Sequence, residues 1–316
     1  MRRGKLVSVI CICFNHEDWI EECLESVRLQ DYPQKELIII ENGSTDDSLQ
    51  VIEKWIKESA GNLKVELISN QEPQSYLALF NQAIKNSNSQ YVVDLSGDDV
   101  LYPDHLSLSV KMLELSRDAA FVFSDAYILD EDGVVKTFYD RKTGGDLVHE
   151  IEVNHIYEIL VQSYYICSPT IVFDRAILLK EGGYDENLTY EDFDIQVRLA
   201  RKYPLVFSDH VGVLKRKLSN SLSSRQYIPY ESKMLPSTLM VCKKIKNMNE
   251  TPSEMKALGK RILFELKHAL WSANFEVATG FIALGEEIHL KSLTLLIYKL
   301  WARFKFDLSW LYTRIG

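Results

Sequence analysis

The sequence has few cysteines and no long apolar run, and each absence excludes a class of protein. Five cysteines are scattered over the 316 residues, and no two of them form a CxxC pair. A structural zinc site is therefore not expected, and we interpret the cysteines as reduced thiols of a protein from a reducing compartment. No apolar segment approaches the ~18–20 residues that a membrane-spanning helix needs.

The start of the sequence does not have the pattern of a secretory signal. The basic stretch Met1–Lys5 is followed by the short, β-branched segment Leu6–Phe14 and then by the polar residues Asn15–Asp18. A signal peptide would have a longer apolar region and a cleavage site of small residues. We expect instead a first strand that ends in a polar loop.

An excess of positive charge is also missing. The formal net charge is −9, which argues against nucleic acid as a partner. The sequence contains no GxGxxG and no GxxxxGK[ST], so neither a dinucleotide fold nor a P-loop enzyme is indicated. It also contains no GxSxG and no HExxH, the motifs of serine hydrolases and of zinc proteases.

What is present is an alternation of buried strands with amphipathic helices. The first hundred residues predict, in order, a strand at Leu6–Cys13, a helix from Trp19, a strand at Glu36–Ile40, a helix at Ser48–Glu58, a strand at Val65–Ile68, a helix at Leu77–Ile84 and a strand at Tyr91–Leu95. Such βαβ units predict an α/β fold with a central, mostly parallel sheet flanked by helices.

The rest of the chain predicts a mixed region and then only helices. The mixed region contains apolar strands at Ala120–Ser124, Ile171–Phe173 and Leu205–Phe207, a hairpin around Asp130–Gly133, and a helix at Phe193–Arg201. From about Tyr227 no strand pattern remains. We predict two domains, a catalytic domain at 1–225 and a helical C-terminal region at 226–316.

Polar residues follow three of the predicted parallel strands, and ligands bind beyond the carboxyl ends of such strands. These residues are Phe14-Asn15-His16, Glu41-Asn42-Gly43-Ser44 and Ser96-Gly97-Asp98-Asp99. Two adjacent carboxylates such as Asp98 and Asp99 repel each other unless a cation or hydrogen bonds offset the charge. Mg²⁺ or Mn²⁺ is suited to such oxygens, but the two acids could equally cap the following segment.

A second acidic cluster, Glu191-Asp192-Phe193-Asp194, begins a predicted helix. Carboxylates are favoured at that end of a helix by its dipole, so helix capping is the alternative to a catalytic role.

Four blocks of the sequence, in this order, resemble the inverting glycosyltransferases of family 2. They are Val7–Asn15 (VSVICICFN), Glu41–Ser48 (ENGSTDDS), Tyr91–Asp104 (YVVDLSGDDVLYPD) and Gly182–Glu186 (GGYDE) with the later Glu191-Asp192 and Arg198. The resemblance covers residues 6 to 200. It implies a GT-A fold and the transfer of a sugar from a nucleotide-diphosphate sugar, a UDP-sugar first of all, to an acceptor hydroxyl.

The resemblance also implies roles for single residues. Asp192 corresponds to the general base, and Asp98, at the last position of the family's DXD motif, to a ligand of a Mg²⁺ or Mn²⁺ ion, with Asp99 beside it. The remaining candidates are substrate-binding residues, namely Phe14, Asn15, Glu41, Asn81, Glu191 and Arg216.

The sequence departs from the family pattern at several of these positions. Ser96 replaces the first acid of DXD, and Asn42 replaces one acid of the second block. Phe80 precedes Asn81 where arginine is common. Lys215 and Arg216 are possible substitutes for the missing diphosphate contacts, near a Ser219-Asn220-Ser221 segment that resembles the family's closing loop; solvated surface charge is the alternative for both.

Two other functions and the setting of the protein stay open at this level. A sugar-1-phosphate nucleotidyltransferase would have a glycine-rich basic loop where this chain has Asn15–Asp18. A non-catalytic nucleotide-sugar-binding protein would keep the fold without the reaction.

The tail at Ile288–Tyr312 mixes apolar and basic residues. This pattern is typical of a helix packed on the protein or of one lying on a membrane surface. We expect a cytoplasmic enzyme of cell-surface polysaccharide or glycolipid synthesis, with a saccharide or lipid-linked saccharide acceptor and possible peripheral contact with the inner face of the membrane.

Overall fold

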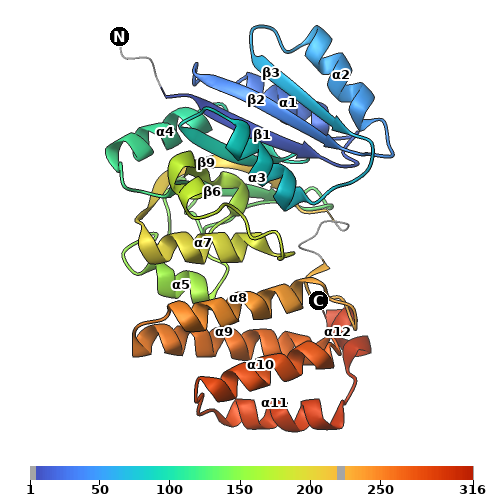
Figure 1. Ribbon diagram of the computed structural model, residues 1–316, viewed down its shortest axis with the longest axis vertical. Coiled ribbons are helices and arrows are strands. Elements are labelled where there is room, and N and C mark those ends of the chain that lie inside the picture. Colours follow the sequence, from blue (N-terminus) through green and yellow to red (C-terminus); the bar gives the residue numbers. More distant parts are fainter. Residues whose placement is uncertain (1–4, 219–224, 316) are drawn as a thin grey trace. The chain divides into compact units, whose positions relative to one another are not determined.

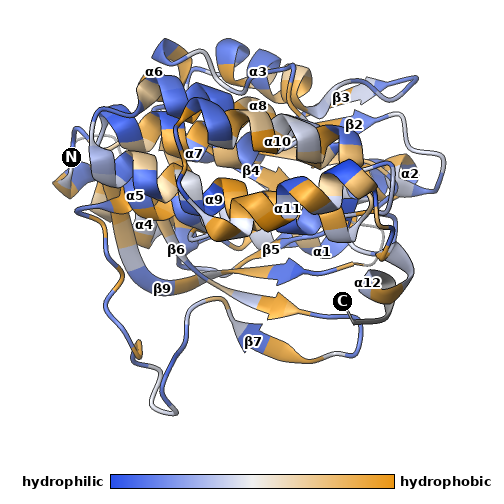
Figure 2. Cartoon of the chain, turned by 90° about the horizontal axis from the view of Figure 1, so that it is seen from below, coloured by the Kyte–Doolittle hydropathy of each residue, from blue (hydrophilic) through white to orange (hydrophobic). Residues whose placement is uncertain are grey.

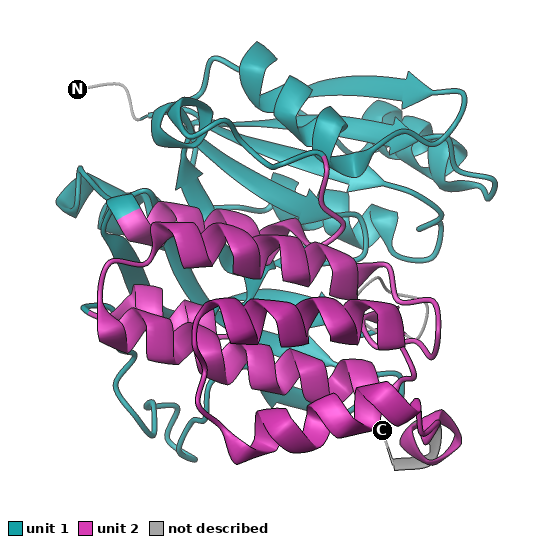
Figure 3. Cartoon of the chain, turned by 60° about the horizontal axis from the view of Figure 1, so that its bottom comes forward, with its two compact units in different colours: residues 1–154, 166–186, 202–217 teal, residues 155–165, 187–201, 218–316 magenta. Residues whose placement is uncertain are grey.

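The chain forms two compact units that are interleaved along the sequence (Figures 1 and 3). The computed structural model describes residues 5–218 and 225–315. One unit comprises residues 1–154, 166–186 and 202–217, and the other comprises residues 155–165, 187–201 and 218–316. The two units do not test the domain boundary expected between residues 225 and 226, and that boundary stays a prediction.

The first unit is built around one sheet, as the alternating pattern predicts. Among the described residues its strands are β1 (Val7–Cys13), β2 (Lys35–Asn42), β3 (Lys64–Asn70), β4 (Tyr91–Ser96), β5 (Val100–Leu101), β6 (Phe121–Leu129), β7 (Val135–Thr137), β8 (Val172–Asp174) and β9 (Leu205–Arg216). Their order is β3-β2-β1-β4-β8-β6-β9-β5, with β7 beside β6. The four strands β3, β2, β1 and β4 are parallel, and β6 is parallel to β9. The predicted α/β fold with a mostly parallel central sheet is confirmed.

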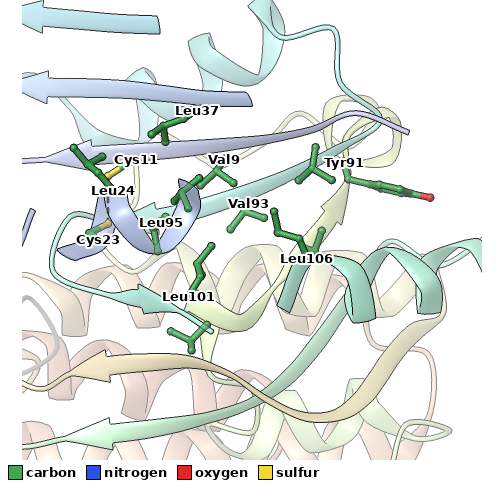
Figure 4. Close-up of a cluster of buried hydrophobic side chains, with 14 of the residues drawn as sticks. Val9, Cys11, Cys23, Leu24, Leu37, Tyr91, Val93, Leu95, Leu101 and Leu106 are labelled. Carbon is green, nitrogen blue, oxygen red and sulfur yellow. Dashed lines mark hydrogen bonds between the residues drawn. The ribbon is translucent and has the colours of Figure 1, made fainter. Parts of the chain in front are cut away.

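Burial on both faces explains why β1 is nearly continuous in apolar residues. All seven residues of β1 are buried. One face packs against α1 (Ile20–Arg28), α2 (Ser48–Glu58) and α4 (His105–Leu115) in a core that includes Val9, Leu24, Val93 and Leu106 (Figure 4). The sulfur atoms of Cys11 and Cys23 lie 3.8 Å apart in this core. All five cysteines are free and buried, in accordance with the interpretation as reduced thiols.

The remaining helices of the first unit are shorter or lie on the other face of the sheet. They are α3 (Tyr76–Asn86), α6 (Arg175–Lys180) and the single turn η1 (Ser168–Thr170). Ser75 begins α3, because its side chain accepts a hydrogen bond from the backbone N–H of Ala78. The apolar side chains of α3 include Leu79 and Phe80, which are buried.

The regular elements in the described part of the second unit are helices, as expected of the C-terminal region. Its helices are α5 (Ile156–Gln162), α7 (Glu191–Lys202), α8 (Met234–Met248), α9 (Pro252–Trp271), α10 (Phe275–Glu287), α11 (Leu293–Phe304) and α12 (Ser309–Ile315). A buried ion pair between Arg261 and Glu265 on α9 lies in its interior, with the guanidinium 4.1 Å from the ring centre of Phe193. Buried charges of this kind require a partner, and each of the two supplies one for the other.

The helices of the described residues include none with the length and apolar character needed to cross a membrane.

Candidate active site

The three polar loops predicted from the sequence come together at one edge of the sheet. In the parallel register Cys13 pairs with Glu41, and Ile12 pairs with both Ile40 and Ser96. The loops that follow β1, β2 and β4 therefore leave the sheet at the same level. Since each carries acids or amides, this edge is the candidate site.

The loop after β1 is held to the loop after β2 by a series of hydrogen bonds. Asn15 has a left-handed φ of 56°, which asparagine tolerates better than most residues. Its backbone N–H donates to Ser44 Oγ at 3.0 Å, and its Oδ1 accepts from the N–H of Thr45 at 2.8 Å. The backbone N–H of His16 donates to Ser48 Oγ at 2.9 Å. Asn15 thus fixes the loop, while Phe14 beside it leaves 42% of its surface exposed.

Glu41 is buried at the end of β2, and protein donors hold both of its oxygens. Its Oε1 accepts from the backbone N–H of Ser44 at 2.6 Å, and its Oε2 accepts from Ser69 Oγ at 3.4 Å. Only 2% of Glu41 is exposed. The carboxylate is therefore held in one orientation by the protein itself, and its expected role in substrate binding stays a prediction.

The acidic pair at the end of β4 combines an accessible carboxylate with a buried one. Asp98 is half-buried, and the hydroxyl of Ser96 donates a hydrogen bond to its Oδ1. Asp99 is 3% exposed and accepts a hydrogen bond of 3.1 Å from the backbone N–H of Arg216. Burial, and next the neighbouring charge of Asp98, raise the pKa of Asp99 to about 7. The two carboxylates thus repel each other, and a cation between them and a ligand would relieve that repulsion.

A divalent ion fits this pair of carboxylates only if a bound substrate supplies the remaining ligands of the metal. Among the described residues no group of three or more His, Cys, Asp or Glu side chains could hold a metal by themselves. Mg²⁺ and similar ions are commonly bound through one or two carboxylates together with substrate phosphates. Asp98, with Asp99 behind it, supplies that number of oxygen ligands.

Arg216, at the end of β9, supports the acidic loop from behind. Its Nη1 donates to the backbone carbonyl oxygen of Asp98 at 2.6 Å, and its Nη2 forms an ion pair with Glu22. Its guanidinium lies 4.7 Å from the ring centre of Trp19. With 6% exposure, Arg216 braces the loop rather than extending into solvent. The segment Ser219-Asn220-Ser221 lies outside the described residues.

His16 is a neighbour of Asp98 to which the sequence gave no role. Its Nδ1 is buried and has no hydrogen-bond partner among the described residues. A Cβ on Gly97 would come within 2.7 Å of that Nδ1, so only glycine allows the ring to cover this turn. Burial lowers the pKa of His16, and the charges of Asp98 and Asp46 oppose this effect. The clue in the sequence was the glycine between Ser96 and Asp98.

Asn81 is held away from solvent by the Gly182–Glu186 turn. Its Oδ1 accepts from the N–H of Tyr184, and its Nδ2 donates to the carbonyl oxygen of Tyr184 and to Glu186, each at 2.9 Å. A Cβ on Gly183 would lie 2.3 Å from Asn81 Oδ1, which explains a glycine there. The Tyr184 hydroxyl in turn donates to Asp94 on β4 at 2.8 Å. Asn81 therefore positions a turn, and a direct role in substrate binding stays a prediction.

Glu191 and Asp192 belong to the second unit, whereas the loops after β1, β2 and β4 belong to the first. Both lie in the first turn of α7 and are half-buried. The next acid, Asp194, is 1% exposed and pairs with Arg198 at 2.6 Å and with Lys244 at 2.8 Å. Asp194 is thus held by two structural ion pairs, and the roles expected for Glu191 and Asp192 stay predictions.

Comparison with known proteins gives a consistent result. Residues 8–161 match the family model described as glycosyl transferase family 2. The chain is 31% identical over 134 residues to the putative glycosyltransferase EpsE of Bacillus subtilis, covering 42% of this chain and 48% of EpsE. It is 23% identical over 230 residues to the O-antigen biosynthesis glycosyltransferase WbnJ of Escherichia coli, covering 71% and 84%. The chain thus spans about half the length of EpsE.

Solved structures show the same fold at low sequence identity. TarS 1–349 of S. aureus, in complex with UDP-GlcNAc, matches with a TM-score of 0.71 and 18% identity over 95% of this chain and 88% of that one. The mannosyltransferase PcManGT of Pyrobaculum calidifontis, in complex with GDP-Man and Mn²⁺, matches with a TM-score of 0.60 and 16% identity over 96% and 85%. The predicted GT-A fold is confirmed.

Proposed function

Because the chain belongs to glycosyltransferase family 2, we propose that it transfers a sugar from a nucleotide-diphosphate sugar to an acceptor hydroxyl with inversion at the anomeric carbon. The observation that supports this most is the convergence of the loops after β1, β2 and β4, where Glu41 is pre-oriented and Asp98 is accessible. A UDP-sugar is the first donor to test, since TarS was solved with UDP-GlcNAc.

Each side chain at this edge has a separate task in the proposed reaction. Phe14, Asn15 and Glu41 bind the nucleoside, with Glu41 accepting hydrogen bonds from the base or ribose. Asp98, assisted by Asp99, would hold a Mg²⁺ or Mn²⁺ ion together with the donor, and the PcManGT structure, which has the same fold, was solved with Mn²⁺. Such an ion supplies positive charge where the leaving diphosphate becomes more negative. Arg216 and Asn81 are the other proposed substrate-binding residues on these loops, and their hydrogen bonds also keep the loops in place.

Asp192 is the proposed general base. It takes the proton of the acceptor hydroxyl while that oxygen attacks the anomeric carbon, and Glu191 beside it binds the acceptor. The nucleoside diphosphate leaves from the opposite face in the same step, so no covalent enzyme intermediate forms. WbnJ is named for O-antigen synthesis, and we extend this to an acceptor that belongs to a cell-surface polysaccharide or glycolipid.

The donor site is tested by thermal unfolding with UDP, GDP, dTDP and CMP, each with and without Mn²⁺. We expect one nucleotide to raise the midpoint only when Mn²⁺ is present, since ligand at ~100 times its dissociation constant adds about 2.7 kcal/mol. Asp98→Asn should remove this metal-dependent shift, because it removes the charged ligand. Asp132→Asn, an equal charge change on an exposed hairpin, should leave the shift intact.

If no nucleotide stabilises the protein under any condition, the donor site is wrong. If a nucleotide binds with the same metal dependence in Asp98→Asn, the metal assignment alone is wrong. Nucleotide binding without any turnover would favour a binding protein that keeps only the fold.

The general base is tested with Asp192→Asn, which retains the shape but cannot accept the proton. We expect the release of UDP from UDP-GlcNAc, to water or to a panel of simple glycosides, to fall by ~10²–10⁴. The thermal shift by the donor should persist. Glu276→Gln, at an acid in the first turn of another helix of the same unit, is the matched control. Near-normal release in Asp192→Asn would remove this residue from the mechanism.

A further inference from the structure

The helix α11 presents an apolar stripe to solvent. The α11 stripe consists of Leu293, Leu296, Ile297, Leu300 and Phe304, which are 74%, 60%, 54%, 55% and 62% exposed. Spacings of three, four and seven residues place them along one face of the helix. Figure 2 shows most of α11 in the colour of hydrophobic residues. A contiguous exposed patch of this kind marks an interaction surface rather than an ordinary protein surface.

The opposite face of α11 fixes the helix with this stripe outward. Leu295 is 6% exposed and lies against Gly285 of α10, where a Cβ would be 3.3 Å from its Cδ2. The ring of Trp301 lies edge-on to Trp271 of α9, with centroids 5.4 Å apart. The helix therefore cannot turn its apolar stripe inward without losing these contacts.

Unpaired positive charge lies at the C-terminal end of the stripe in a chain that is acidic as a whole, while Lys299 in the middle of the helix pairs with Glu286. Within residues 288–316 the sequence has five basic residues and one acid, Asp307, whereas the whole chain has a net charge of −9. Arg303 and Lys305, on the last turn of α11 and just after it, are exposed and form no ion pair among the described residues. Phe306 and Trp310 follow with 60% and 59% of their surface exposed.

We propose that the α11 stripe docks on an anionic phospholipid surface, with the helix lying in the plane of the interface. The leucines enter the boundary of the acyl chains, and Arg303 and Lys305 face the headgroup phosphates. Twelve residues make a helix of ~18 Å, which can lie on a bilayer but is too short to span one. This surface goes beyond the proposed transfer reaction and does not depend on it.

A second copy of the chain fits the stripe less well than a lipid surface does. Stable protein interfaces use about 20–30 residues on each side. The stripe offers five side chains on one short helix, with few neighbours. A symmetric contact would also bring the unpaired Arg303 and Lys305 of one copy close to those of the other.

The test is co-sedimentation of the full chain with vesicles of phosphatidylcholine, alone or mixed with phosphatidylglycerol. We expect binding to the mixed vesicles that weakens as salt increases. The double variant Leu296→Ser/Leu300→Ser should bind at least about tenfold more weakly, because each leucine loses its apolar contribution. Leu29→Ser/Leu115→Ser, at leucines that are 51% and 72% exposed in the other unit, should bind as the unchanged protein does.

A second pair of variants separates charge from apolar contact. Arg303→Gln/Lys305→Gln should lose about fivefold in affinity per removed charge on the mixed vesicles, and little on phosphatidylcholine. Lys54→Gln/Lys57→Gln, at exposed lysines of α2, is the matched control. All these positions are at the surface, and unchanged unfolding midpoints would show that the variants fold.

The proposal is overturned if the protein does not bind the mixed vesicles, or if the stripe and control variants lose binding equally. It is also overturned if light scattering finds a dimer that Leu296→Ser/Leu300→Ser abolishes, since a second copy would then occupy the stripe. None of these measurements involves donor or transfer, so they can fail while the proposed function holds.

Discussion

Outside the candidate site, the buried His105 and the half-buried His210 form a pair of neighbouring titratable side chains. His105 on α4 is fully buried, and its Nδ1 lies 3.1 Å from Nε2 of His210 on β9. His210 Nδ1 lies 2.9 Å from Ser208 Oγ. Burial, and next the charge of His210, lower the pKa of His105 to about 3. Burial lowers the pKa of His210 as well, while the charges of Asp104, Asp209 and Asp125 oppose this effect and that of Arg141 adds to it.

Replacing His105 should therefore change how stability depends on pH. The unfolded chain takes up a proton on this histidine near its ordinary pKa of ~6.5, whereas the folded protein does not until about pH 3. The free energy of unfolding thus falls as pH drops through this window, by up to about 1.4 kcal/mol per pH unit for one group. In His105→Asn, whose amide can replace Nδ1, this slope should be smaller.

Urea unfolding at several pH values between about 6.5 and 4.5 measures the slope. His149→Asn, at an exposed histidine, is the control and should leave it unchanged. An equal slope in His105→Asn and the unchanged protein would mean that His105 is protonated in the folded state.

At the residue scale, the sequence predicted which positions carry acids and amides, but not which of them point at one another. The strand ends identified Asn15, Glu41 and Asp98 because parallel strands share one edge. Nothing local indicated that Arg216 would reach the carbonyl of Asp98, 118 residues away. Nor did the sequence indicate that Asn81 would use its amide on the backbone of Tyr184. These contacts depend on tertiary packing, which no local pattern records.

Among the elements, α9 has the most complete start signal of the described helices. Thr251 accepts a hydrogen bond from the N–H of Glu254, Glu254 accepts one from the N–H of Thr251, and Pro252 occupies the first turn. Thr251→Ala should lower the free energy of unfolding by about 0.5–2 kcal/mol, because the first turn loses a partner for a backbone N–H. Urea unfolding measures this. Thr251→Ser keeps the hydroxyl and should have little effect, and an equal loss in both variants would exclude the cap as the cause.

The strand β9 shows where prediction from local patterns fails at the element scale. The sequence predicted Leu205–Phe207, but the strand extends to Arg216. Ser208, Asp209 and His210 interrupt the apolar pattern, and polar residues usually end a buried strand. Here Asp209 and His210 have distant partners, since Asp209 pairs with Arg141 at 2.8 Å and His210 with His105, while the hydroxyl of Ser208 lies 2.9 Å from His210 Nδ1. By contrast, α2 was predicted with its observed bounds, because its start signal and apolar face are both local.

For the whole molecule, the alternation of strands and helices was enough to predict the class of fold, and the later run of helices was predicted as well. The sequence did not indicate that α5 and α7 would belong with the C-terminal helices rather than with the strands that surround them. The sequence pattern of α5 and α7 is that of any amphipathic helix. It does not indicate which part of the chain their apolar faces contact. Tyr157 of α5, for example, donates to Asn249 at 2.7 Å.

This interleaving has a consequence for synthesis in the cell. On α5, Glu158 accepts a hydrogen bond from Ser253 and Gln162 accepts one from Lys260, each at 2.8 Å, and both donors are on α9. The start of α9 leaves the ribosome roughly 90 residues after the end of α5, which takes on the order of 5–20 seconds at ~5–20 residues per second. During that interval the chain completes the first unit through β8 and β9, while the C-terminal helices that α5 and α7 contact are not yet complete.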